Sequence, residues 1–180
     1  GLDRLRGNGE RAMLRENAGS DAVIEAFRDS PPRTVEGARL LARAWMKRGD
    51  EAAARKALAE IWRTRRLDSA SEAAILREFG EIIPASDHRV RMERMLYADR
   101  ADAAARVASR AKAEGLAKAW SAVIRGAKDA GALLEAVPQA ERGAGYIFAK
   151  ARYLRRAGKY HDAAKVLLTS PGGEAEVGSV

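Results

Sequence analysis

The spacing of apolar residues along this chain predicts short amphipathic helices from one end to the other. In the stretch VEGARLLARAWMKR, residues 35–48, Leu41, Ala44 and Trp45 recur at intervals of three and four and fall on one side of a helix. No segment shows the sustained alternation of β-branched residues that is typical of a half-buried strand. The pattern therefore predicts an all-α protein.

Proline and glycine divide this pattern into segments. Proline cannot continue a helix, and glycine adopts the left-handed conformation that often ends one. The divisions fall at Pro31-Pro32, Gly49, Pro84, Pro138 and Gly158. They leave roughly ten short helices, joined by turns short enough to make neighbouring helices antiparallel. The expected helices cover residues 9–17, 21–30, 35–48, 51–66, 73–79, 86–97, 101–112, 115–128, 130–137, 145–157 and 160–168.

Residues that accept hydrogen bonds from backbone N–H groups precede several of these helices. Thr34 and Asp50 are predicted N-caps. Ser69 and Glu72 have the S-x-x-E spacing of a capping box ahead of the helix at 73–79.

Two of the hairpins are similar in sequence. Residues 42–58, ARAWMKRGDEAAARKAL, align with residues 151–167, ARYLRRAGKYHDAAKVL, when Gly49 is matched to Gly158. The G-x-Y-x-x-A spacing that begins at Gly158 resembles the turn of a tetratricopeptide repeat.

The intervals between such units are uneven, which argues against a strict repeat array. We predict an irregular right-handed superhelix, an α-solenoid of tetratricopeptide-like αα-hairpins. It forms one domain at residues 1–170, or a fragment of a larger one, and residues 171–180 form a flexible tail without apolar periodicity.

Composition and charge narrow the classes of function. The 39 alanines among 180 residues favour helix, and the absence of cysteine excludes disulfides and thiolate chemistry. The formal net charge of +8 makes a polyanionic partner plausible. The alternative is that the charges are solvated helix faces with a modest basic excess. No apolar run is long enough to span a membrane.

The sequence contains none of the common catalytic or cofactor motifs. The two histidines, His88 and His161, accompany no G-x-S-x-G nucleophile motif and no H-E-x-x-H metal motif. Phosphate-binding and dinucleotide-binding glycine patterns are missing as well. We therefore assign no catalytic residue, no metal and no cofactor to these 180 residues.

The stretch SDHRVRMERMLYADR, residues 86–100, concentrates polar chemistry. Asp87, or Ser86 before it, stands where the N-cap of this helix belongs. We interpret the first polar residues as a hydrogen-bonded group that holds the hairpin to its neighbours, and ligand binding is the alternative. The candidate residues for this structural or ligand-contact cluster are Asp87, His88, Arg91, Arg94, Tyr97 and Arg106.

The pattern D-H-x-x-R-x-x-R-x-L-Y in this stretch, followed by an alanine-rich helix with an arginine, resembles the superhelical domain of large soluble lytic transglycosylases of alphaproteobacteria. It is carried by Asp87, His88, Arg91, Arg94, Leu96, Tyr97, Ala104 and Arg106. The hairpins at 41–83 and the segments ALLEAVP and GYIFAKARYLRRAGKYHDAAKVLL also resemble that family, so the similarity covers about residues 30–168.

The resemblance implies a non-catalytic scaffold in the periplasm, with peptidoglycan glycan strands as its partner. In that family a separate lysozyme-like domain cleaves the MurNAc–GlcNAc linkage without hydrolysis and leaves a 1,6-anhydroMurNAc end. The E-S dipeptide and the G-L-M-Q stretch of that domain do not occur here. The scaffold's own catalytic domain would therefore lie outside this chain, and the cluster at 86–106 would be a structural or glycan-contact cluster.

Two other functions fit parts of the sequence. One is a tetratricopeptide-like module that binds another protein and has no connection with cell-wall chemistry. The other is a helical-repeat RNA-binding protein, which the irregular spacing disfavours because such proteins read bases with side chains at fixed repeat positions.

Overall fold

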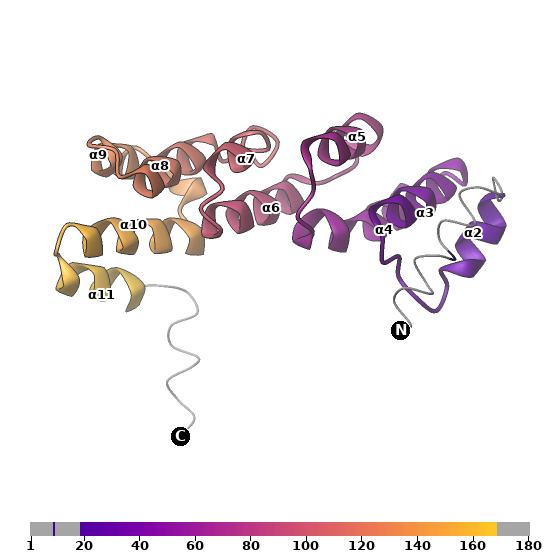
Figure 1. The fold of residues 1–180 in the computed structure, drawn as a ribbon, viewed down its shortest axis with the longest axis horizontal. Coiled ribbons are helices and arrows are strands. Elements are labelled where there is room, and N and C mark those ends of the chain that lie inside the picture. Colours follow the sequence, from indigo (N-terminus) through magenta and orange to yellow (C-terminus); the bar gives the residue numbers. More distant parts are fainter. Residues whose placement is uncertain (1–8, 10–18, 169–180) are drawn as a thin grey trace, which may run out of the picture. The chain divides into compact units, whose positions relative to one another are not determined.

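The structure, a computed structural model, describes Gly9 and residues 19–168. This described part of the chain is built from helices and contains no strand (Figure 1). The prediction of an all-α protein is therefore confirmed at this level. The helix expected at 9–17, apart from Gly9, and the tail expected at 171–180 lie outside the described residues.

The chain forms two compact units, which divide between Asp87 and His88. The sequence predicted one domain at 1–170, and this stays a prediction, because two compact units can belong to one helical array or to two domains. Unit 1 contains α2 (Ser20–Ala26), α3 (Val35–Lys47), α4 (Glu51–Thr64) and α5 (Ser69–Phe79). Unit 2 contains α7 (Ala101–Ala105), α8 (Glu114–Arg125), α9 (Ala130–Glu135), the 3-10 turn η1 (Gln139–Glu141), α10 (Ala144–Arg156) and α11 (Tyr160–Leu168). Helix α6 (Ala85–Tyr97) contains the division between the units.

In unit 1, α2 and α4 both pack against α3. The apolar side predicted for α3 faces this contact: Leu41 and Ala44 are buried together with Val23 and Phe27 of the α2 segment. Trp62 of α4 is also buried. Burial of such side chains stabilises a fold by roughly 1.5–3 kcal/mol each.

In unit 2, α10 packs against α8, α9 and α11, and α8 also contacts α7. Figure 1 shows α10 and α11 side by side as a hairpin. Trp120 and Leu116 of α8 and Leu134 of α9 are almost completely buried. Alanines at positions 117, 119 and 122 of α8 are buried too, and their small side chains allow neighbouring helices to approach closely.

Five turns in the described chain close in the same way. In each turn one residue has left-handed backbone, and the N–H of the next residue donates to the carbonyl oxygen five residues earlier, at 2.8–3.1 Å. The left-handed residues are Gly49, Asp99, Lys112, Gly126 and Gly158, with φ between 51° and 76°. The turns at Gly49 and Gly158 were expected from the sequence. A turn at Asp99 and Arg100, between the helices expected at 86–97 and 101–112, was expected too. The left-handed backbone of Asp99 and of Lys112 was not expected, because neither residue is glycine.

Replacing Lys112 by glycine should raise the free energy of unfolding by up to about 1 kcal/mol, because left-handed backbone costs a side-chain-bearing residue roughly 1–2 kcal/mol. The Lys112 side chain is exposed, so little packing is lost. Urea unfolding measures the change. The reverse substitution Gly126→Ala is the matched control: no atom lies within 4 Å of the added Cβ, so it should destabilise through the backbone alone. A destabilised Lys112→Gly variant would contradict the argument.

Two predicted N-caps are confirmed and two predicted starts are wrong. Thr34 Oγ1 accepts from Gly37 N at 2.9 Å, and Asp50 Oδ1 accepts from Ala53 N at 2.8 Å. The capping box at Ser69 is wrong: the residue before it, Asp68, caps α5 by accepting from Ser71 N at 2.7 Å. A carboxylate one position earlier provides the acceptor, so Ser69 becomes the first helical residue.

The start of α6 also differs from the prediction. The helix begins at Ala85, directly after Pro84, whose carbonyl oxygen accepts from Asp87 N at 2.9 Å. Asp87 therefore lies inside the first turn and is not the N-cap, and Ser86 is not the N-cap either.

The helix expected at 101–112 is shorter than predicted, because α7 ends at Ala105. After α7 the backbone forms a tighter turn than an α-helix, in which Val107 N donates to Ala104 O, three residues earlier, at 3.1 Å. This tighter path buries Val107, Ala108 and Ala111.

Candidate functional site

The structure divides the polar cluster predicted at 86–106 into a buried group and an exposed group. Asp87, His88 and Arg91 are 4%, 1% and 2% exposed. Arg94 and Arg106 are exposed, and Tyr97 is 45% exposed. Buried positions agree with the interpretation that the first three residues hold the hairpin, and they leave Tyr97 as the member of the cluster with an accessible ring.

Asp87 is held by an arginine of α4. Nε of Arg63 donates to Oδ1 of Asp87 at 2.9 Å, and the Nη2 atom of Arg63 contacts the same oxygen. The carboxylate is almost completely buried, whereas the arginine side chain is 45% exposed. This pair ties α4 to the first turn of α6 and gives Asp87 a structural role.

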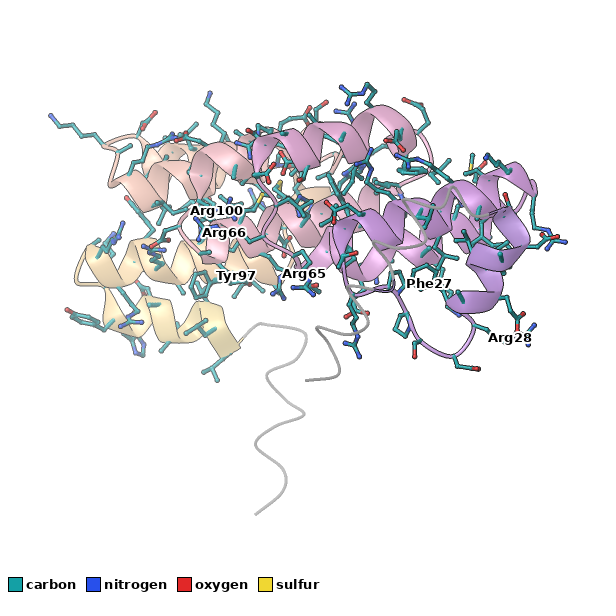
Figure 2. The ribbon with its side chains drawn as sticks, turned by 45° about the vertical axis from the view of Figure 1, so that its right-hand side comes forward. Phe27, Arg28, Arg65, Arg66, Tyr97 and Arg100 are labelled. Atoms are coloured by element: carbon teal, nitrogen blue, oxygen red, sulfur yellow. The ribbon has the colours of Figure 1, made fainter. Side chains whose placement is uncertain are left out.

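An aromatic cluster surrounds the exposed ring of Tyr97. Its ring centroid lies 4.7 Å from that of Trp120, edge-on, and 4.8 Å from that of Phe148. Trp120 is buried, whereas Phe148 is 38% exposed. Helices α6, α8 and α10 thus place two accessible rings on one buried indole, and we call Tyr97 and Phe148 the aromatic platform. Figure 2 labels Tyr97 beside the C-terminal helices of unit 2.

The environment of Tyr97 raises the pKa of its phenol. Partial burial is the larger cause, and the carboxylate of Glu93, one turn earlier on α6, is the second. Both favour the neutral phenol. The platform therefore presents an uncharged ring with a hydroxyl group at neutral pH.

A cavity of about 580 Å³ lies next to the platform and shares Phe148 with it. Residues 148, 152 and 155 lie on one side of α10 because they are four and three residues apart. Residues 160 and 167 lie on one side of α11 because they are seven residues, about two helical turns, apart. We call this the arginine cavity; its walls include Phe148, Arg152, Arg155, Arg156, Tyr160 and Leu167.

Two of the three arginines are held by neighbours within unit 2. Arg152 donates from both Nη atoms to the carboxylate of Asp99, with Nη2 3.0 Å from Oδ2. This lowers the pKa of Asp99 and raises that of Arg152, chiefly through the hydrogen bonds. Arg156 donates from Nη1 to the carbonyl oxygen of Val123 at the end of α8. Arg155 has no ion-pair partner among the described residues.

Sequence reasoning found Tyr97 and missed the rest of this surface. Phe148, Arg152 and Arg155 were treated as ordinary helix residues of the segment 145–157. Their common spacing along one helix face was the signal that could have found them. Their proximity to Tyr97 could not be predicted, because it depends on how α6 and α10 pack.

Unit 1 has a larger and more apolar cavity, of about 810 Å³, between α2, α3 and α4. We call it the unit 1 groove; its walls include Ile24, Phe27, Pro31, Leu41 and Trp45, with Arg28 and Lys56 among its charged residues. Figure 2 labels Phe27 and Arg28 at this end of unit 1.

Neither metal-binding nor membrane-spanning features occur in the described ranges. No group of three or more His, Asp or Glu side chains could hold a metal ion among residues 9 and 19–168. Over the same residues, no helix combines the length and apolar character needed to cross a bilayer.

Comparisons of the chain with protein-family models, with curated proteins and with solved structures gave no match.

Proposed function

We propose that this chain is a non-catalytic helical scaffold that binds peptidoglycan glycan strands in the periplasm, as the superhelical part of a lytic transglycosylase. The cleavage of the MurNAc–GlcNAc linkage would belong to a catalytic domain outside these residues. In this proposal the hairpins form an irregular tetratricopeptide-like superhelix. The similar turns at Gly49 and Gly158 support that arrangement.

The observation that carries the proposal is the aromatic platform beside the arginine cavity. Two exposed rings, Tyr97 and Phe148, offer an apolar surface on which the apolar face of a sugar ring can pack. The arginines of the cavity place positive charge next to that surface. A glycan strand that carries carboxylates presents the complementary chemistry, a row of sugar rings with negative charges beside them.

The remaining charge pattern supports the same class of partner. The formal net charge of the chain is +8. Such an excess attracts polyanions in general, so the charge alone does not distinguish a cell-wall polymer from a nucleic acid. Salt dependence does distinguish them in part, because ring packing persists when ionic attraction is screened.

The test is co-sedimentation of the purified chain with isolated sacculi across a salt series, next to an RNA of equal charge. We expect binding to sacculi to persist at moderate salt while RNA binding is lost. Tyr97→Ala should weaken the binding to sacculi about tenfold, equivalent to about 1.4 kcal/mol.

Met46→Ala is the matched control for this substitution. Met46 is a similarly exposed apolar residue, 41% exposed, in unit 1. It should leave the binding to sacculi unchanged. The proposal fails if the chain does not bind sacculi at low salt, or if both variants reduce binding equally.

A second candidate function is a tetratricopeptide-like module that binds another protein. The unit 1 groove favours it, because its walls are mainly apolar and its volume is ample for side chains of a peptide. A pull-down that returns one protein in stoichiometric amount, with no affinity for sacculi, would favour this candidate. Loss of that partner in a Phe27→Ala variant that remains folded would assign it to the groove.

A further inference from the structure

We propose that the arginine cavity of unit 2 binds the carboxylate of a ligand that also presents an apolar face, with Arg155 as the residue that recognises the charge. The inference rests on the proposed function only for the choice of a sugar as the first probe. It concerns the chemistry of one site, whereas the proposed function concerns the partner of the whole chain.

The charges that line the cavity leave one guanidinium available. Asp99 and Arg152 neutralise each other through two hydrogen bonds. Arg156 is anchored by Nη1 to the end of α8, at Val123 O, with Ile124 O 3.4 Å from the same atom. Arg155 is exposed and lines the same cavity without an ion-pair partner among the described residues. The cavity therefore has a net positive charge that an anion can balance.

The anchored pairs also make the site rigid. The bidentate contact between Arg152 and Asp99 links α10 to the turn after α6, since Asp99 is the left-handed residue of that turn. The contact between Arg156 and Val123 links α10 to α8. Both contacts fix the face of α10 from which Arg155 projects, so binding does not require the backbone of this face to become ordered.

The shape of the cavity favours a small carboxylate over a bare inorganic anion. Its volume of about 580 Å³ lies in the range of small-molecule sites, roughly 300–1,000 Å³. Phe148, Tyr160 and Leu167 contribute apolar walls, and Tyr160 is 70% exposed at the start of α11. The planar guanidinium of Arg155 can donate two parallel hydrogen bonds to a carboxylate.

A matched pair of sugars tests the proposal. N-acetylmuramic acid and N-acetylglucosamine share the pyranose ring and the acetamido group, and the first has in addition a lactyl ether with a carboxylate. Titrations of the full chain, followed by NMR or calorimetry, should detect binding of the first sugar and at least tenfold weaker binding of the second. Arg155→Gln should weaken binding of N-acetylmuramic acid at least fivefold, and Arg155→Lys should restore part of it.

Arg125→Gln is the control for the loss of one positive charge in unit 2. Arg125 pairs with Asp102 on the surface, where both side chains are more than half exposed. This variant should bind N-acetylmuramic acid as the unaltered chain does. Circular dichroism of all three variants verifies that the helices are retained.

Two further probes identify the source of the carboxylate and the need for an apolar part. If N-acetylalanine binds as tightly as N-acetylmuramic acid, and Arg155→Gln weakens both, the carboxylate chemistry is supported and its source is a peptide. Inorganic phosphate should bind at least tenfold more weakly. Equal affinity for phosphate, or equal affinity for the two sugars, would overturn the proposal.

The outcome for this site is separable from the outcome for the proposed function. Sacculi that bind the chain, with no binding of any small carboxylate at tens of millimolar, would overturn the cavity proposal and leave the scaffold proposal in place. Arg155-dependent binding of N-acetylmuramic acid without binding to sacculi would support the cavity proposal and overturn the scaffold proposal.

Discussion

Replacing Trp120 with alanine should destabilise unit 2 by about 3–5 kcal/mol, the usual range for removing a large aromatic side chain from a core. Trp120 is completely buried in α8 and contacts the rings of Tyr97 and Phe148. Its removal leaves a cavity that the neighbouring helix backbones cannot fill without moving. A loss of this size is a large part of the total stability of a small domain, roughly 5–15 kcal/mol.

The measurement uses the distribution of tryptophans. Trp45 and Trp62 belong to unit 1, and Trp120 is the remaining tryptophan of the chain. In the Trp120→Ala variant, tryptophan fluorescence therefore reports unit 1, while far-UV circular dichroism reports all helices. We expect part of the helical signal to be lost at lower urea than the fluorescence transition.

Tyr160→Ala is the control, because Tyr160 is 70% exposed on α11 and its removal should change stability by less than about 0.5 kcal/mol. Coincident transitions in the Trp120→Ala variant would contradict the expectation and indicate that the chain unfolds as one cooperative unit.

Helices and glycine turns could be predicted because their signals are local. The apolar periodicity of residues 35–48 depends on the chain alone, and Leu41 and Ala44 are buried as expected. Gly49 and Gly158 indicate their turns in the sequence, because glycine has no Cβ to oppose left-handed backbone. Asp99 takes the same conformation without such a signal. Its carboxylate is bound by Arg152 from α10, a contact 53 residues away that the local sequence does not contain.

Positions that align between the two similar hairpins differ in how deeply they are buried. The hairpin alignment matches Leu58 with Leu167, and the turns at Gly49 and Gly158 agree. Leu58 is 1% exposed, whereas Leu167 is 46% exposed and lines the arginine cavity. The alignment predicts the local turn, because the turn depends on the hairpin itself. Burial depends on which further elements cover each hairpin, and this differs between them.

The candidate site could be predicted only in part, because local sequence indicates some of its residues but not their partners on distant helices. Asp87, His88 and Arg91 were recognised as polar residues near the start of their helix, and their burial agrees with a structural role. Tyr97 was included in the cluster, but its aromatic partner Phe148 lies 51 positions later. Tertiary packing of α10 against α8 brings the platform together, and the local sequence of either helix carries no information about that contact.

Replacing Gly145 with alanine has two opposing effects on the free energy of unfolding. Alanine is favoured over glycine in a helix interior by about 1 kcal/mol, and by no more than this at Gly145, which lies in the first turn of α10. An added Cβ would lie 2.8 Å from Cζ3 of Trp120 and 2.9 Å from Cδ of Glu93, closer than carbon atoms can pack. Because Trp120 is completely buried, its ring has little room to move. Overpacking costs about 1–3 kcal/mol and should outweigh the helix preference.

Gly145→Ala is therefore expected to lower the free energy of unfolding by about 1–2 kcal/mol in urea titrations, and to weaken binding at the aromatic platform because Phe148 lies one turn later on α10. Trp120→Phe removes the outer part of the indole, so the double variant should be more stable than the sum of the single effects predicts. Gly131→Ala is the matched control: its Cβ would meet the Tyr153 hydroxyl, and Trp120→Phe should not relieve that contact. Strict additivity in the Gly145 pair, or a stabilised Gly145→Ala variant, would mean that α10 does not press directly on the indole and that the platform is held by other contacts.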